Sequence, residues 1–273
     1  MNSTHAPQAD WTLLVETPAL LGVVKPAGLL SVPGRGASKA DCLIARVQRR
    51  FPEARIVHRL DQATSGVMVL ARTADAHRDL GWQFERREVS KRYVAIVTGH
   101  LAGHPTGPVA GHLAGHPAGH PTGIVAGHLA TDEGEIDLPL RKALADGPRH
   151  VVDPVHGKPA ITRWRVVERT TLGRLRDAID AIADRGLAAG SPIASSADPA
   201  SPITRLHLVP LTGRSHQLRV HLRHLGHAVL GDEFYASPEV LALASRLMLH
   251  AEALTFRDPV DGRAIDLRAD AGW

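Results

Sequence analysis

The chain has 273 residues, which suits one large domain or two small ones, and 44% of them are hydrophobic, enough to bury a core. Charged residues make up an ordinary 22%, which argues against wholesale disorder. The 32 basic residues outnumber the 28 acidic ones, for a net charge of +4. This modest excess fits a solvated basic surface and attraction to a polyanion equally well.

A single cysteine, Cys42, excludes an intramolecular disulfide and with it a secreted, disulfide-stapled design. The N-terminal segment lacks the basic stretch followed by an apolar stretch that marks a signal peptide. No apolar run approaches the ~20 residues that span a bilayer. We therefore expect a cytoplasmic protein without a membrane anchor.

Glycine and proline divide the N-terminal part of the chain into short elements. We expect a strand within 1–17, a strand, turn and second strand over 20–32, a helix over 38–50 capped by Ser38, a buried strand over 67–74, a helix over 74–87 and a strand over 93–97.

Residues 99–130 form an imperfect repeat of Gly, His, Pro and Ala without core-forming periodicity. Its histidines are His100, His104, His112, His116, His120 and His128. A histidine-rich tract can bind metal, whereas a low-complexity insertion grown by duplication needs no metal. Because no fixed geometry holds the imidazoles, we interpret the tract as an insertion and predict no metal site.

Beyond the tract the pattern becomes that of a folded chain again. We expect a strand within 156–169, a helix over 172–187, a loop over 188–202, a strand over 203–213, a helix over 215–226, and a helix or strand over 247–256. Strands and helices mix without a clean βαβ repeat, so the predicted fold class is α+β with a mixed or largely antiparallel sheet.

Three segments combine reactive side chains with nearby residues that favour tight turns. Asp61, in HRLDQATSG at 58–66, is either a turn residue or a functional carboxylate. Tyr93 follows two cations and is typical of a tyrosine whose ring packs in the core while its hydroxyl faces solvent. Arg219 and Arg223 share a helix face, which indicates either a basic surface or an anionic partner such as a carboxylate or phosphate.

The segment HRLDQATSG resembles the catalytic motif of the RluA-type pseudouridine synthases, which is HRLD followed by TSG. Further motifs of that family have similar segments here, in family order: VVKPAGLLSVPG at 23–34, KRYVAIVTG at 91–99, GRSHQLRVHL at 213–222, GHAVLGDEFYASPE at 226–239 and RLMLHAEALTF at 246–256. The resemblance spans most of residues 20–257, and several motifs in order are far more specific than HRLD alone.

This resemblance implies an isomerase that breaks the N-glycosidic bond of a uridine in RNA, rotates the base and rejoins it through carbon. It implies no metal and no other cofactor. The implied fold is α+β, with a mixed, mainly antiparallel central sheet flanked by helices and loops and an active-site cleft across the sheet.

The resemblance also implies roles for particular residues. Asp61 matches the nucleophile, Tyr93 matches the residue that stacks on the base and is a candidate for proton transfer, and Arg219 matches the arginine that pairs with the aspartate. The implied substrate-binding residues are His58, Arg59, Leu60, Thr64, Arg214, His216 and Leu249. Among them, Arg59 would hold the RNA after base extrusion and Leu249 would pack against the uracil.

We expect one catalytic domain over 1–273, with insertions at about 99–130 and 171–203 and no S4-type RNA-binding domain. The motifs most resemble the dual-specificity branch, which implies a tRNA anticodon loop or a 23S rRNA hairpin as substrate, and a monomer without an obligate protein partner. The alternatives are a catalytically silent RNA-binding protein of the same fold and a histidine-rich metal-binding protein. The intact set of Asp61, Tyr93 and Arg219 favours the enzyme.

Overall fold

The computed structural model describes residues 10–36, 39–99, 132–143, 147–183 and 191–273. Ser38, and the histidine-rich tract beyond Gly99, lie outside these residues. The chain divides into two compact units. The first unit comprises the chain up to Tyr93 together with Leu249–Ala271, and the second comprises Val94–Met248 with the last two residues.

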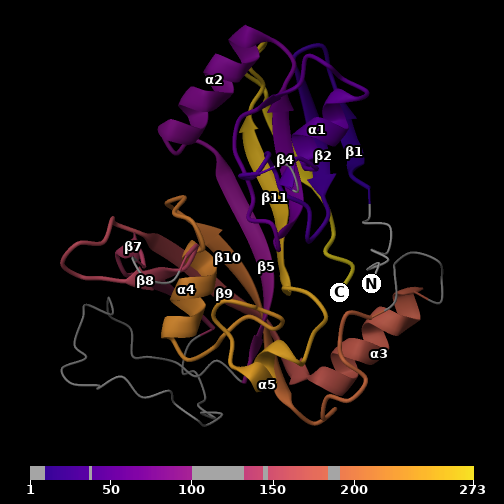
Figure 1. Cartoon of the computed structure of the whole chain (residues 1–273), viewed down its shortest axis with the longest axis vertical. Coiled ribbons are helices and arrows are strands. Elements are labelled where there is room, and N and C mark those ends of the chain that lie inside the picture. The colour runs from indigo at the N-terminus through magenta and orange to yellow at the C-terminus, as the bar shows by residue number, and fades with distance from the viewer. Residues whose placement is uncertain (1–9, 37–38, 100–131, 144–146, 184–190) are drawn as a thin grey trace. The chain divides into compact units, whose positions relative to one another are not determined.

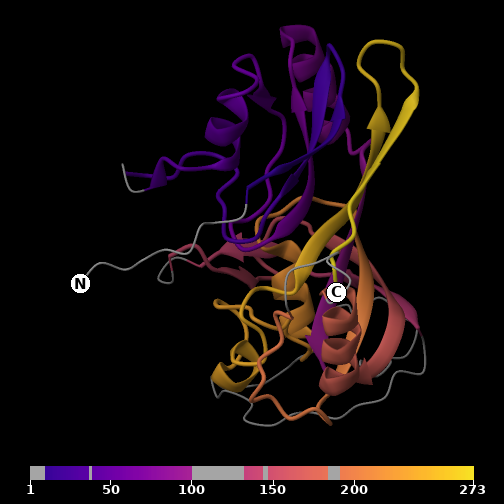
Figure 2. The ribbon, with the colours of Figure 1, turned by 90° about the vertical axis from the view of Figure 1, so that its right-hand side faces the viewer.

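The first unit contains a mixed sheet with the strand order β1-β2-β4-β11 (Figure 1). Its elements are β1 (Thr12–Glu16), β2 (Leu20–Lys25), α1 (Leu43–Gln48), β3 (Arg55–Ile56), β4 (Ser65–Ala71), α2 (Ala74–Glu85), β11 (Leu249–Arg257) and β12 (Ala264–Arg268). Strand β3 pairs with β4, and β12 forms an antiparallel hairpin with β11 (Figure 2, yellow). The pairing of β4 with β11 is parallel, whereas β2 pairs antiparallel with both β1 and β4.

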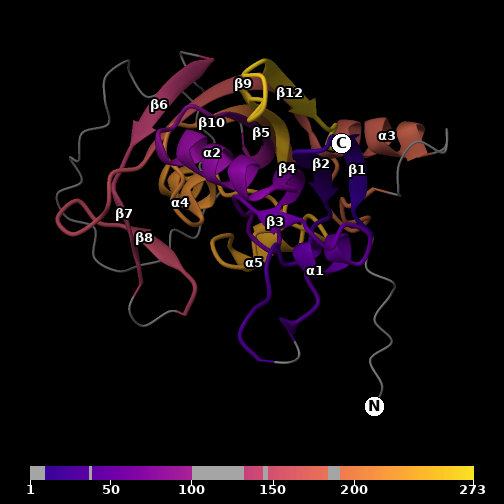
Figure 3. The same cartoon turned by 90° about the horizontal axis from the view of Figure 1, so that it is seen from above.

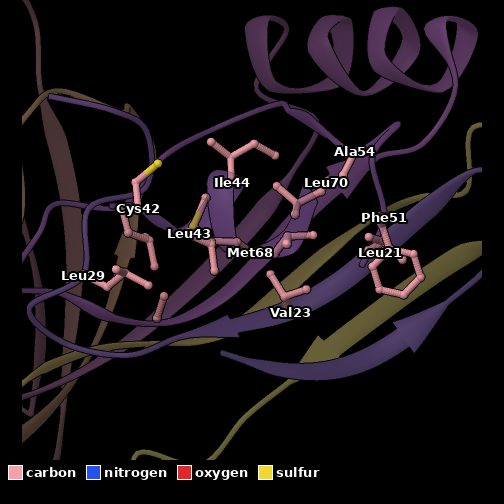
Figure 4. Close-up of a cluster of buried hydrophobic side chains, with 13 residues drawn as sticks. Leu21, Val23, Leu29, Cys42, Leu43, Ile44, Phe51, Ala54, Met68 and Leu70 are labelled. Carbon is pink, nitrogen blue, oxygen red and sulfur yellow. The ribbon is translucent and has the colours of Figure 1, made fainter. Parts of the chain in front are cut away.

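Strand β4 is apolar from Val67 to Ala71 because this part lies between two hydrophobic clusters. All seven of its residues are buried. Met68 and Leu70 join the cluster that α1 and β2 contribute to (Figure 4), whereas Val67, Val69 and Ala71 join the cluster beneath α2. Successive side chains of a strand point to opposite faces, so a strand covered on both faces needs a continuous apolar run.

Helix α2 begins where its sequence signals place it. The Thr73 side chain accepts a hydrogen bond from the backbone nitrogen of Ala76 at 3.1 Å, and Asp75 lies in the first turn. Both features stabilise a helix N-terminus. Leu80 and Ala76 are buried on the face toward β4, so capping and core burial act together.

The second unit contains an antiparallel sheet ordered β10-β9-β6 and a separate two-stranded hairpin, β7–β8 (Figure 3). Its elements are β6 (Glu133–Asp137), β7 (Leu140–Lys142), β8 (His150–Val152), β9 (Ile161–Thr171), α3 (Leu172–Ala183), β10 (Pro202–Pro210), α4 (Gln217–His224) and α5 (Pro238–Leu241). Strand β5 (Ser90–Thr98) contains the boundary between the two units, after Tyr93.

These elements confirm an α+β fold with a mixed, mainly antiparallel sheet. The second strand expected within 20–32 is wrong: after β2 the chain turns, and only a single bridge joins Leu30 to Cys42. The helix expected over 38–50 begins only at Leu43, with Cys42 as its N-cap. The undecided segment 247–256 forms strand β11.

None of the helices in the described ranges is long and apolar enough to cross a membrane. A single catalytic domain over 1–273 stays a prediction beside the two compact units found here. The insertion predicted near 171–203 contains helix α3, whose residues Leu172, Leu175 and Ile179 are buried.

Candidate active site

Asp61 occupies the loop that leads into β4. Its backbone oxygen accepts a hydrogen bond from the Thr64 nitrogen at 3.1 Å, so Asp61 opens a four-residue turn that ends at Thr64. The Asp61 side chain is half-buried. The turn therefore accounts for an aspartate at position 61. It also leaves the Asp61 carboxylate partly accessible to solvent.

The residues on either side of Asp61 are tied to the segment that follows β2. The Ser31 hydroxyl donates to the Leu60 oxygen at 2.7 Å and accepts from the Leu60 nitrogen at 3.1 Å. The Gly28 nitrogen donates to the Gln62 oxygen at 2.8 Å, and the Gln62 side-chain amide donates back to the Gly28 oxygen at 3.0 Å. Four hydrogen bonds thus fix the backbone around Asp61.

Lys25, at the end of β2, is fully buried beneath this loop. Its ammonium donates to the oxygens of Pro26 at 2.8 Å, Leu29 at 2.7 Å and Gln62 at 3.1 Å. Burial lowers the pKa of Lys25 to about 7, and the opposing influence is the charge of Asp61. Sequence reasoning missed this residue, although a lysine at the end of the buried strand LLGVVK was a usable signal.

Tyr93 lies close enough to Asp61 for the carboxylate charge to affect the pKa of its phenol. Burial raises the pKa of Tyr93, and the Asp61 carboxylate raises it further. The half-buried ring packs against the hydrophobic cluster that contains Leu60 and Met68. The phenol is therefore neutral at ordinary pH.

His58 has a structural function in the first unit. Its Nε2 accepts a hydrogen bond from the Val69 nitrogen at 3.1 Å, and its ring stacks on Phe84 with centroids 4.4 Å apart. Burial lowers the pKa of His58 to about 3, with a smaller contribution from Lys91. Of its neighbours in the motif, Arg59 is exposed, whereas Leu60 and Thr64 are buried. Substrate contacts of these four residues stay predictions.

Ser65 and His250 join the start of β4 to β11. The Ser65 Oγ lies 2.8 Å from His250 Nδ1, and His250 Nε2 lies 3.1 Å from the Ala269 oxygen. A carbonyl oxygen only accepts, so His250 Nε2 carries a proton and donates a hydrogen bond to the Ala269 oxygen. This link fixes the strand that begins with Leu249, which is itself buried.

Arg219, on α4 of the second unit, forms a buried ion pair. Its Nε donates to Asp232 Oδ2 at 2.7 Å and its Nη2 to Oδ1 at 2.5 Å. The two side chains are 2% and 0% exposed, so the pair is desolvated and depends on this two-point geometry. The sequence pattern left a basic surface and an anionic partner open, and the structure shows that the partner is the Asp232 carboxylate. A role for Arg219 toward Asp61 stays a prediction.

Two more predicted substrate-binding residues lie just before α4. The Arg214 Nε donates to the Pro159 oxygen at 3.1 Å, and the side chain is half-buried. His216 adopts a left-handed backbone conformation with φ of 55° and has its Nδ1 2.7 Å from the Tyr235 hydroxyl. Across the described residues, no group of three or more His, Cys, Asp or Glu side chains is placed to hold a metal ion.

Residues 19–224 match the family model of RNA pseudouridylate synthases. The chain therefore belongs to the RNA pseudouridylate synthase family, whose members are isomerases that convert uridine to pseudouridine in RNA.

Curated relatives agree with this membership over the whole length. The dual-specificity RNA pseudouridine synthases RluA of Salmonella typhi and of Escherichia coli (strain K12) are each 39% identical over 274 residues, covering 100% of this chain and 99% of the relative. The Haemophilus influenzae relative of the same name is 35% identical over 92% of this chain and 89% of its own.

Solved structures show the same fold. Human RNA Pseudouridylate Synthase Domain Containing 1 aligns with a TM-score of 0.65 at 22% identity, covering 98% of this chain and 86% of that one. Human RNA Pseudouridylate Synthase Domain Containing 4 gives a TM-score of 0.58 at 21% identity, covering 95% and 88%.

Proposed function

We propose that this family member is a cytoplasmic, monomeric dual-specificity synthase that modifies uridines in a tRNA anticodon loop and a 23S rRNA hairpin. Support for dual specificity comes from the relatives of that name, which match 99% of their length to this chain. Support for turnover, as opposed to silent RNA binding, comes from the intact set of Asp61, Tyr93 and Arg219, and from Lys25, which is hydrogen-bonded beneath the Asp61 loop.

In the proposed mechanism the Asp61 carboxylate is the nucleophile that attacks the target nucleotide after the base leaves the RNA stack. The four hydrogen bonds that hold Leu60 and Gln62 fix the backbone that carries this carboxylate, which lowers the entropic cost of reaching the transition state. The proposal covers attack on either the uracil ring or the ribose.

Tyr93 stacks against the target base and is a candidate for proton transfer in this proposal. Burial and the Asp61 charge raise the pKa of Tyr93, so the phenol is neutral when the base stacks on it. Arg219 is proposed to stabilise the aspartate in its charged form, and Leu249 to give an apolar contact to uracil. Arg59, exposed two residues before Asp61, is proposed to meet a phosphate of the RNA.

Asp61→Asn tests the central claim. The amide is nearly isosteric but lacks the nucleophilic charge, so pseudouridine formation should be abolished while RNA binding and the unfolding midpoint stay near those of the wild type. The measurement is pseudouridine mapping across total RNA from cells that lack the gene and carry either version. Asp41→Asn, at an exposed carboxylate of the same unit, is the control and should behave as wild type.

Retained activity in Asp61→Asn would contradict the proposed role of Asp61 as the nucleophile. If the wild-type protein binds RNA and adds no pseudouridine to any RNA, the silent RNA-binding alternative replaces the proposed enzyme. Modification at a single site would contradict dual specificity alone.

A further inference from the structure

Four aromatic side chains of the second unit form a continuous group, here called the ring cluster: His150, His216, Phe234 and Tyr235. His216 stacks on Phe234 with centroids 5.5 Å apart and an interplanar angle of 13°. His150 lies 5.4 Å from His216, and Tyr235 meets both His216 and Phe234 edge-on. Tyr235 is buried, whereas the other three rings are half-buried and reach the surface.

Polar contacts fix the ring cluster without any ligand. The Tyr235 hydroxyl accepts a hydrogen bond from the His150 backbone nitrogen at 2.8 Å, so its own proton is available to His216 Nδ1 at 2.7 Å. Asp232 Oδ1 accepts from the backbone nitrogens of Phe234 and Tyr235 at 3.0 and 3.1 Å. A surface held this firmly loses little side-chain entropy when a ligand stacks on it.

The backbone of His216 supports a functional reason for this arrangement. Residues with a side chain rarely adopt a φ of 55°, and such strain gathers at functional positions. His216 occupies the N-cap of α4, yet its side chain makes no capping hydrogen bond. Helix capping therefore does not explain a histidine here, whereas presentation of its ring beside Phe234 does.

Basic side chains lie beside the ring cluster. Arg219 is neutralised by its buried pair with Asp232, so the exposed charges are those of the β7–β8 hairpin. The Arg219 guanidinium lies 5.1 Å from the Phe234 centroid and 5.2 Å from that of Tyr235. On the β7–β8 hairpin, exposed Lys142 is the register partner of His150, and exposed Arg149 precedes it. Aromatic faces flanked by cations suit unpaired nucleotides, since bases stack on rings while phosphates meet the charges.

We propose that the ring cluster is a stacking subsite for one unpaired base of the RNA loop other than the target uridine, with Lys142 and Arg149 meeting the adjoining phosphates. This inference rests on the proposed action on RNA loops. It assigns His150, Phe234 and Tyr235 to substrate recognition and gives His216 a defined contact, the face of a base.

The test uses 2-aminopurine, whose fluorescence is quenched by stacking, placed at each loop position in turn of a tRNA anticodon stem-loop and a 23S rRNA hairpin. Wild-type protein should change the fluorescence at one further position besides that of the target uridine. Phe234→Leu and His216→Ala should remove that signal and weaken RNA binding about 10-fold, as expected for the loss of one stacked base. His156→Ala, at an exposed histidine outside the cluster, should change nothing.

Phe234→Tyr, which keeps an aromatic face, should restore the signal and so separates stacking from folding. The subsite is overturned if wild-type protein gives no signal beyond the target position, or if Phe234→Leu and His216→Ala keep it as His156→Ala does. Pseudouridine is measured on the unlabelled RNAs in parallel. Absence of pseudouridine with the stacking signal intact would overturn the proposed function and leave the subsite standing.

Discussion

The pair formed by Arg219 and Asp232 serves the fold of the second unit whatever else Arg219 does. Asp232 binds the guanidinium at two points and also accepts from two backbone nitrogens. Removing Arg219 would leave a buried carboxylate unpaired, at a cost of about 3–5 kcal/mol. Loss of activity in Arg219→Ala therefore does not by itself demonstrate a catalytic role.

A matched pair of variants separates the two roles. Asp232→Asn removes the negative partner of the same ion pair but keeps the Arg219 charge, whereas Arg219→Ala removes that charge. We expect kcat to fall by about 100-fold or more in Arg219→Ala, as for loss of one charged group at a reacting centre, and by less than about 10-fold in Asp232→Asn. Single-turnover assays at a temperature where both variants stay folded give these values. Equal losses would assign Arg219 to the fold alone.

His58 is another residue whose structural function can be measured. Its pKa is about 3 in the folded protein, against 6.5 for an ordinary histidine. Between these values the unfolded chain binds a proton that the folded protein excludes, so stability falls as pH falls through that window. The loss approaches about 1.4 kcal/mol per pH unit.

His58→Gln tests this dependence because glutamine can accept from the Val69 nitrogen but does not titrate. At about pH 5 the wild type should have lost about 2 kcal/mol more unfolding free energy than His58→Gln, relative to neutral pH. Urea denaturation at several pH values measures it. His77→Gln, at an exposed histidine of the same unit, is the control. Parallel pH profiles for wild type and His58→Gln would refute the buried, neutral state.

Among the elements, β4 and β11 show how backbone geometry fixes the motif that follows Asp61. They pair in parallel through Ser65 with His250 and Gly66 with Ala251. Gly66 has a φ of 127°, and a Cβ placed on it would lie 2.3 Å from the Ala251 oxygen. The glycine of the TSG segment is therefore required by the pairing of the two strands.

Gly66→Ala should consequently destabilise the protein by at least about 3 kcal/mol, because both strain and overlap with backbone oppose it. Gly81, on α2, gives the matched control, since a Cβ there meets nothing within 4 Å. Gly81→Ala should stabilise by about 0.5–1 kcal/mol through helix propensity. Thermal unfolding of both variants checks the opposite signs, and a stable Gly66→Ala would contradict the assigned pairing.

How well the sequence predicted an element depended on how local its determinants are. Helix α2 was predicted from Ala74 because Leu80 and Phe84 are spaced four residues apart, which is a local pattern, and the structure adds Thr73 as its N-cap. The strand expected after the KPAG turn was wrong because the carbonyls of Pro26 and Leu29 bind the buried Lys25 ammonium and so are not available to a strand partner. Segment 247–256 was left undecided, since an apolar run suits a buried helix or a buried strand until its partners are known.

At the scale of the whole molecule, the net charge of +4 predicts that the affinity for RNA depends on salt concentration. Binding that rests on phosphate contacts should weaken by about 10-fold or more between about 50 and 200 mM salt. Arg59→Gln should reduce the slope of log affinity against log salt by about one contact, or roughly 0.7–0.9. Filter binding across the salt range measures both slopes. Arg263→Gln, at an exposed arginine of the β11–β12 hairpin, is the control and should keep the wild-type slope. An affinity that does not depend on salt would contradict phosphate recognition.

The sequence by itself determined the family and the candidate nucleophile, because HRLD, TSG and the later motifs are local strings that a single chain displays. Asp61 as a turn residue was likewise readable, since its partner Thr64 lies three residues away. Only the tertiary structure revealed Lys25 beneath the Asp61 loop, Asp232 against Arg219, and the ring cluster. Each of these depends on side chains meeting across distant segments, and those meetings are decided by packing and burial, which no spacing in the sequence encodes.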